Sequence, residues 1–273
     1  MDVGKAIILG IVQGLTEFLP ISSSGHLVLG KHLLGLQEQG IQFEVFVHFG
    51  SLLAVLTVFS RDIGNLVKAF FAFFSASTRA KGVRAYYHEN ADFRLLLFII
   101  MASVPAAIIG LALQDQIETA FGSPRFACSM LIVTAVILFL TLFVKKADGS
   151  LTLRNTLIMG LAQAVAILPG ISRSGSTISA GLYQKVNGRE AARFSFLLAV
   201  PAVLGATALK AVELVEFGIG GDMFMQLAAG MIAAYVSGFL AIESLLAVVG
   251  RGKLYWFAPY CLLVGVLGLI FIK

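Results

Sequence analysis

Long runs of apolar residues dominate the chain, and six of them are long enough to cross a lipid bilayer. A transmembrane helix needs about 20 consecutive, mainly apolar residues. The six runs cover residues 43–59, 95–113, 127–144, 194–212, 224–249 and 255–272. Pro105 and Pro201 lie inside two of them, where membrane helices tolerate proline, and each is expected to mark a kink. The pattern predicts an all-α polytopic membrane protein with six transmembrane helices.

Two further apolar stretches, residues 5–33 and 155–183, are interrupted near their middle by turn-forming residues. The first carries Pro-Ile-Ser-Ser-Ser-Gly at 20–25, and the second carries Pro-Gly-Ile-Ser-Arg-Ser-Gly at 169–175. Turn residues at this density end a helix. Irregular backbone survives at membrane depth only when it is buried in protein or lines a wet cavity. We therefore expect two re-entrant pairs of half-helices, each with a polar loop near the membrane midplane.

The two broken stretches resemble each other at a constant offset of 150 residues. The aligned pairs are Gly10 with Gly160, Gln13 with Gln163, Ile21 with Ile171, Ser22 with Ser172, Ser24 with Ser174, and Gly25 with Gly175. This predicts a duplication within one membrane domain, 1–273, with repeats 1–150 and 151–273. Each half then has one re-entrant pair and three spans. Because three is odd, the second half must be upside down, as in known inverted-topology repeats.

The charged residues assign an orientation in the membrane. Basic residues concentrate in 60–94, 145–154 and 185–193 and at Arg251 and Lys253, whereas 34–42, 114–125 and 213–223 are mainly acidic. By the positive-inside rule the basic segments are cytoplasmic, which places both termini outside the cytoplasm. The N-terminus has a single early lysine, Lys5, and no small-residue cleavage site. We interpret it as retained mature chain rather than as a signal peptide.

Composition supports the membrane assignment and excludes other classes. Hydrophobic residues make up 58% of the 273 residues and charged residues 13%, whereas soluble domains have roughly 45–50% and about 25%. The net charge of +5 is scattered, so no basic stripe predicts binding to nucleic acid. Cys128 and Cys261 both lie in apolar runs, which argues against a disulfide framework or a metal cluster.

Ionisable side chains inside the broken stretches are the main candidates for a site. Gln13 and Glu17 are four residues apart and share one helix face. His26 follows the first break, and Arg173 lies in the second. An ionisable residue inside a membrane segment costs at least about 2.5–3.5 kcal/mol and is functional by default. Because Arg173 has no carboxylate in its own stretch, its expected partners are Glu17 and an anionic ligand.

The breaks also predict a cradle for an anion. Half-helices beginning just after Ser24 and Ser174 would direct unpaired backbone N–H groups at the centre, and helix N-termini bind phosphate. The guanidinium of Arg173 can fork onto two phosphate oxygens. Further donors are the hydroxyls of Ser22, Ser23, Ser172, Ser174, Ser176 and Thr177. The alternative is that the serines are helix caps and that Arg173 and Glu17 form a structural ion pair.

These residues carry a resemblance to a known family. Gln13-Gly-Leu-Thr-Glu17-Phe-Leu-Pro20-Ile-Ser-Ser-Ser-Gly-His26 resembles the first signature, with its (E/Q)xxxE element, of the BacA-type undecaprenyl-diphosphatase family. Pro169-Gly-Ile-Ser-Arg173-Ser-Gly-Ser-Thr177 resembles its second signature, PGxSRSxxT. Length, hydropathy and repeat spacing fit from end to end. Gln13 stands where some relatives have Glu, which weakens any metal site built on two carboxylates.

The resemblance implies an enzyme of the bacterial inner (plasma) membrane. It would hydrolyse undecaprenyl pyrophosphate to undecaprenyl phosphate and inorganic phosphate at the periplasmic side, with a divalent cation, either magnesium or calcium. This reaction recycles the lipid carrier of cell-wall synthesis and gives bacitracin tolerance. Undecaprenyl pyrophosphate and membrane lipid would be its partners, and the oligomeric state stays open, with a homodimer as one option.

A mechanistic hypothesis follows for the individual residues. Ser23 is the nucleophile, activated by Glu17 or His26, and Arg173 completes the catalytic set. The pyrophosphate is held by Gln13, Ser22, Ser24, Ser172, Ser174 and Thr177, and a metal ion would bridge Glu17 and phosphate oxygens. A histidine nucleophile and direct attack by water stay open. The rival functions are an inverted-repeat secondary transporter and a lipid flippase that uses the same anion site.

Overall fold

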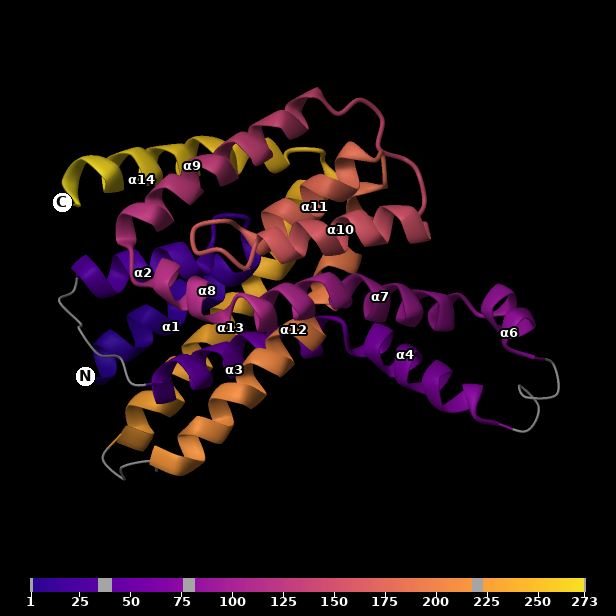
Figure 1. Cartoon of the computed structure of the whole chain (residues 1–273), viewed down its shortest axis with the longest axis horizontal. Helices are drawn as coiled ribbons and strands as arrows, with labels where there is room; N and C mark the ends of the chain where they lie inside the picture. The colour runs from indigo at the N-terminus through magenta and orange to yellow at the C-terminus, as the bar shows by residue number, and fades with distance from the viewer. Residues whose placement is uncertain (1, 34–40, 76–81, 218–222, 273) are drawn as a thin grey trace.

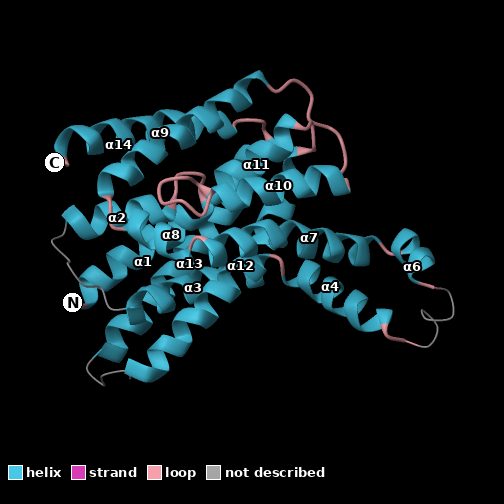
Figure 2. Ribbon diagram, in the orientation of Figure 1, coloured by secondary structure: helices cyan, strands magenta, loops and turns pink. Residues whose placement is uncertain are grey.

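The computed structural model describes residues 2–33, 41–75, 82–217 and 223–272, which form helices and no β-sheet (Figure 1, Figure 2). The α-helices are α1 (Val3–Phe18), α2 (Ser23–Leu33), α3 (Ile41–Val58), α4 (Ser60–Phe73), α6 (Val83–Glu89), α7 (Ala91–Ala112), α8 (Gln114–Phe121), α9 (Pro124–Leu140), α10 (Leu153–Val165), α11 (Arg173–Tyr183), α12 (Gly188–Phe217), α13 (Phe224–Gly250) and α14 (Ala258–Phe271). Short 3₁₀ turns, η1 (Thr141–Phe143) and η3 (Leu254–Phe257), follow α9 and precede α14. The predicted all-α membrane architecture is confirmed at this level.

The six predicted spans fall almost entirely within helices, but not all of them stand alone as membrane-crossing helices. Within the described residues, four helical segments are long and apolar enough to cross a membrane: α7, α9 with η1, α13, and η3 with α14. A fifth would be the pair α3 and α4, which is bent by 80°. The predicted span 194–212 lies inside the single long helix α12. Six spans therefore stay a prediction. The predicted orientation of these spans rests on charged residues, four of which lie outside the described residues: Glu38, Arg79, Lys81 and Asp222.

Residues 60–94, for which the charge pattern indicated only a basic, cytoplasmic segment, contain a further helix. After Phe59 the chain turns sharply into α4, a helix with one buried and one exposed face. Leu66 is buried, whereas Val67 and Phe71 are 48% and 67% exposed. Charged residues such as Lys68 interrupt the apolar run, so a search for continuous hydropathy overlooks this helix. Its amphipathic character is typical of helices that lie at a membrane interface.

Each broken stretch is a pair of helices in contact, α1 with α2 and α10 with α11. Pro20 disfavours helical backbone at the residue before it, and Leu19 has extended dihedral angles. In the second break Gly170 takes a φ of +94°, a conformation that only glycine adopts without strain. The prediction of two interrupted helix pairs is therefore confirmed.

The second helix of each pair begins earlier than the sequence predicted. We expected starts just after Ser24 and Ser174, but α2 begins at Ser23 and α11 at Arg173. The reason is that the first serine of each group caps its helix. Ser22 Oγ accepts a hydrogen bond from the Gly25 amide at 3.3 Å, and Ser172 Oγ accepts one from the Gly175 amide at 3.1 Å.

Glycines bring the first helix of each pair directly against a long helix. A Cβ added at Gly10 in α1 would lie 2.2 Å from the carbonyl oxygen of Gly230 in α13. One added at Gly160 in α10 would lie 2.3 Å from the carbonyl oxygen of Ala102 in α7. Small residues allow such backbone approach between membrane helices. Since α1 carries Gln13 and Glu17, its contact with α13 fixes where those side chains lie.

We expect Gly10→Ala to destabilise the protein by about 1–3 kcal/mol, because the added methyl group meets backbone atoms that cannot turn away. Gly64→Ala in α4 is the matched control, since a Cβ there has nothing within 4 Å. That control should be neutral or stabilising by up to about 1 kcal/mol, because alanine favours helix over glycine. Thermal unfolding in detergent measures both. If the thermal unfolding midpoint of Gly10→Ala equals that of Gly64→Ala, the close approach of α1 to α13 at Gly10 is contradicted.

Candidate active site

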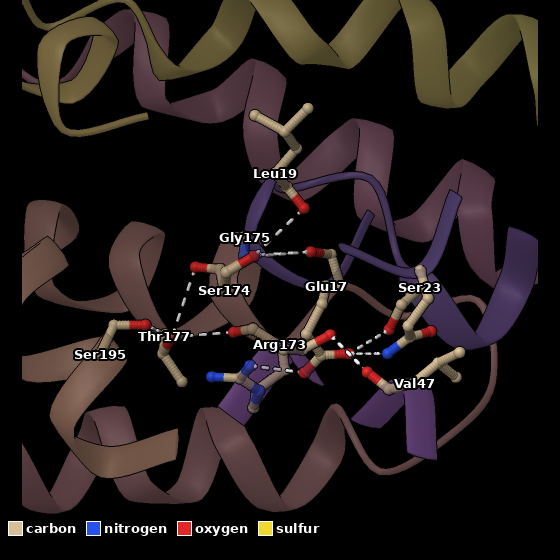
Figure 3. A network of polar contacts seen from close by, with 12 residues as sticks. Glu17, Leu19, Ser23, Val47, Arg173, Ser174, Gly175, Thr177 and Ser195 are labelled. Carbon is tan, nitrogen blue, oxygen red and sulfur yellow. Dashed lines mark hydrogen bonds and ion pairs between the residues drawn. The ribbon is translucent and has the colours of Figure 1, made fainter. Parts of the chain in front are cut away.

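The carboxylate of Glu17, near the C-terminal end of α1, receives hydrogen bonds from three side chains (Figure 3). Arg173 Nη2 donates to Oε1 at 2.8 Å and forms an ion pair. Ser23 Oγ donates to Oε2 at 2.7 Å, and Gln13 Nε2 donates to the same oxygen at 3.1 Å. The Glu17 and Arg173 side chains are only 9% and 15% exposed. The structure thus contains the expected ion pair between the two broken stretches.

Two of these donors stand at equivalent places in the two stretches. Ser23 is the first residue of α2, and Arg173 is the first residue of α11. The first amides of a helix have no intrahelical partner, and the helix dipole is positive there. Glu17 is therefore held at two helix N-termini, a position that suits a carboxylate or a phosphate.

The same cluster keeps one spare donor and one spare acceptor. Arg173 Nη1 and Gln13 Oε1 are buried and have no hydrogen-bond partner. Buried polar atoms are almost always paired, so such exceptions ask for an explanation, of which a bound ligand is one. An anion at Arg173 Nη1 would supply the missing acceptor.

The other predicted serines brace the two breaks against each other. Ser24 Oγ accepts a hydrogen bond at 3.4 Å from the amide of Gly170 in the second break. Ser174 Oγ donates at 3.3 Å to the carbonyl oxygen of Leu19 in the first break. Each serine thus reaches from its own helix start to the opposite loop. With Ser22 and Ser172 as caps, these hydroxyls bond to the protein itself, and their contact with substrate stays a prediction.

Thr177, the last predicted binding residue, is completely buried within α11. Its Oγ1 lies 2.5 Å from Ser195 Oγ in α12 and donates to the carbonyl oxygen of Arg173 at 2.8 Å. It therefore fixes the first turn of α11, from which the arginine side chain extends. Its contribution to the site in this structure is the placement of Arg173.

Both ring nitrogens of His26 are occupied by partners other than Glu17. Nδ1 is 2.8 Å from the carbonyl oxygen of Ser22, and Nε2 is 2.8 Å from the hydroxyl of Tyr260. Because a carbonyl can only accept, Nδ1 carries a proton, and in the neutral ring the tyrosine donates to Nε2. Ser22 has a φ of +70°, so His26 supports a strained turn directly before Ser23.

Three residues of this neighbourhood were not predicted from the sequence: Thr134, Ser195 and Tyr260. Thr134 Oγ1 donates to the carbonyl oxygen of Gly170 at 2.8 Å and accepts from the Ser172 amide at 3.0 Å, which fixes the second break. A hydroxyl inside an apolar span carries little signal, because serine and threonine in helices commonly bond the preceding turn. Ser103 does so here, donating to the Ile99 carbonyl oxygen.

The cluster offers oxygen ligands that suit a hard divalent cation only in part. Within the described ranges, no three His, Cys, Asp or Glu side chains gather as a metal site. Glu17 and the unpaired Gln13 Oε1 are two oxygen donors, and magnesium is commonly held by one or two carboxylates together with substrate phosphates. These residues therefore fit a cation that is shared with a bound pyrophosphate.

A small cavity lies beside Glu17, between α3 and α12. Apart from Glu17 it is lined by Phe18, Ser51, Leu52, Val55, Ala199, Val200 and Val203. Ser51 donates its hydroxyl to the carbonyl oxygen of Val47 at 3.0 Å, and the other residues that line the cavity beside Glu17 have apolar side chains.

Comparisons with known proteins show the family to which the chain belongs. Residues 6–267 match the family described as bacitracin resistance protein BacA. An undecaprenyl-diphosphatase of Salinibacter ruber is 48% identical over 267 residues, which cover 97% of each chain. Those of Desulforapulum autotrophicum and Korarchaeum cryptofilum are 40% and 41% identical, each over at least 97% of both chains. The chain belongs to the BacA family.

Proposed function

We propose that this protein hydrolyses undecaprenyl pyrophosphate to undecaprenyl phosphate and inorganic phosphate. The observation that carries the proposal is the Ser23 hydroxyl bonded to Glu17, which is itself paired with Arg173. This places a nucleophile, a base and an anion partner together, as phosphoryl transfer requires. Family membership and the names of the relatives select the lipid pyrophosphate as substrate. The reaction recycles the cell-wall lipid carrier and gives bacitracin tolerance.

The geometry supports one sequence of steps. Ser23 Oγ attacks the terminal phosphorus while Glu17 Oε2 takes its proton, and the bond to the bridging oxygen breaks to release undecaprenyl phosphate. Glu17 passes that proton to the departing phosphate oxygen. Water then attacks the phosphorus of the phosphoserine while Glu17 takes a proton from it. The bond to Ser23 Oγ breaks, Glu17 returns the proton to that oxygen, and inorganic phosphate is released. Arg173 Nη1 and the first amides of α2 and α11 neutralise charge on the phosphoryl oxygens. A divalent cation, held by Glu17 and Gln13 with the pyrophosphate, would add further charge neutralisation when bound.

We also propose that the molecule is an inverted repeat of 1–150 and 151–273 with six spans. Equivalent residues perform equivalent tasks: Ser22 and Ser172 cap helices, and Ser24 and Ser174 brace the opposite break. The helix contacts agree, because α1 packs on α13 while α10 packs on α7. Both chain ends lie at the end of the molecule opposite α6 (Figure 1), which supports a common, periplasmic side for the termini.

The decisive test is release of phosphate from undecaprenyl pyrophosphate by detergent-purified protein, with no membrane gradient present. Catalytic turnover under these conditions is expected of an enzyme. A transporter or flippase that only moves the lipid would release no phosphate. The same assay with added chelator, followed by magnesium or calcium, tests the cation.

We expect Arg173→Lys to lose most of its turnover, although the positive charge is kept. A lysine ammonium is a point charge and cannot bind Glu17 and a phosphate oxygen with two separate nitrogens. Phosphate release and thermal stability should be measured together. Near-normal turnover would show that Arg173 is only a counter-ion for Glu17.

We expect Ser23→Ala to abolish turnover while the lipid pyrophosphate still binds, because the arginine and the amides are kept. Ser24→Ala, which removes a brace rather than the nucleophile, is the matched control. It should retain turnover and lose about 0.5–1.5 kcal/mol of stability, the usual contribution of one hydrogen bond. Substantial turnover in Ser23→Ala would point instead to a water molecule activated by Glu17, or to His26.

The proposed orientation predicts the reactivity of single added cysteines. Gln116 in α8 and Ser150 are both exposed, and the native Cys128 and Cys261 are buried. In intact cells an impermeant thiol reagent should label Gln116→Cys but not Ser150→Cys. In lysed cells the reagent should label both variants. If only Ser150→Cys is labelled in intact cells, the orientation of the protein in the membrane is opposite to the one proposed.

A further inference from the structure

An apolar groove of about 460 Å³ lies between α4, α7 and α12. Its walls include Leu66 and Phe70 from α4, Ile99 and Ile100 from α7, and Leu197 and Leu204 from α12. Ser103 is the single residue with a polar side chain among those that line it, and its hydroxyl already donates to the Ile99 carbonyl oxygen at 2.8 Å. The groove therefore presents hydrocarbon and no unpaired hydrogen-bonding side chain.

The groove and the small cavity beside Glu17 share one lining residue, Val200. This side chain lines both the groove and the small cavity beside Glu17. On α12, Ala199 and Val203 face the cavity, whereas Leu197 and Leu204 face the groove. With about 3.6 residues per turn, these two sets occupy adjacent faces of the helix. The groove therefore begins one side chain away from the cavity at Glu17, and a ligand that occupies both has to displace or pass Val200.

The bend after Phe59 creates the groove. It turns α4 by 80° away from α3, and α4 then packs on α7. Arg193 of α12 forms an ion pair with Asp62, in the first turn of α4. The two contacts hold α4 as a wall, at a distance from α12 that leaves the groove between them.

We propose that this groove binds the isoprenoid chain of the substrate, nearest to its pyrophosphate end. The inference rests on the proposed function and adds the site for the lipid part. A volume of this size is within the range of about 300–1,000 Å³ seen for small-molecule sites, unlike a flat lipid-facing helix surface. Because lipid tails surround the protein, apolar contact alone does not favour the isoprenoid chain of the substrate over other lipid tails. The tail is selected because its head group is bound at Glu17.

The first test narrows the groove with tryptophan. Ile100→Trp in α7 and Val67→Trp in α4 project into it, and both positions are about half exposed. Ile108→Trp is the matched control, because Ile108 lies on the same helix as Ile100, is 60% exposed and does not line the groove. We expect the two groove variants to raise KM for undecaprenyl pyrophosphate about tenfold, with kcat little changed. Ile108→Trp should match the parent protein.

The second test uses a polyprenyl phosphate with a diazirine in its first isoprene units. Irradiation should attach it to peptides of α4, α7 or α12, and Ile100→Trp should reduce this labelling. Excess undecaprenyl phosphate should compete, and excess phospholipid should not. Labelling spread equally over α9 and α14, or displacement by phospholipid, would overturn the proposal.

The outcomes separate the groove from the function. If the parent protein releases no phosphate from undecaprenyl pyrophosphate, the proposed function is wrong. If the parent protein is active and both groove variants keep the KM of Ile108→Trp, the function stands and the groove assignment is overturned.

Discussion

The structure depends on the ion pair between Glu17 and Arg173 at the meeting of two broken helices. Charges removed from water cost several kcal/mol each, and loss of one partner of a buried pair costs about 3–5 kcal/mol. Here the carboxylate is compensated by a guanidinium, a hydroxyl and an amide group. The helix N-termini add favourable dipoles. Free helix N-termini are not available beside an unbroken membrane helix, whose amides are already paired, so this part of the stabilisation requires both breaks.

The two stretches are alike where they build the framework and differ where chemistry is needed. The serine caps and braces occur twice, at equivalent positions. Glu17 corresponds to Ile167, and Ser23 corresponds to Arg173. The framework therefore presents one carboxylate to two unlike side chains, a hydroxyl on one oxygen and a guanidinium on the other. If the two stretches were identical, both would carry a serine or both an arginine at this position. The site would then lack either the guanidinium or the nucleophilic hydroxyl.

Much of this arrangement was accessible from the sequence because it follows from local rules. Proline, glycine and serine located the breaks, and the cost of burying Glu17 and Arg173 identified them as partners. The start of α2 was misplaced because three consecutive serines can each cap a helix. The helix α4 was overlooked because its apolar residues occupy one face only. Tyr260 gave no signal, since its contact with His26 spans 234 residues.

The bracing of the breaks also bears on the choice between enzyme and transporter. Alternating access moves one repeat or bundle against the other around a fixed site. Here the Arg173 ion pair and the hydrogen bonds from Ser174 to Leu19 and from Gly170 to Ser24 all join the two breaks at the site itself. Rocking at that depth would break all three and leave buried charges unpaired. A catalyst needs the opposite property, a preorganised site that does not rearrange as charge develops, and this network favours it.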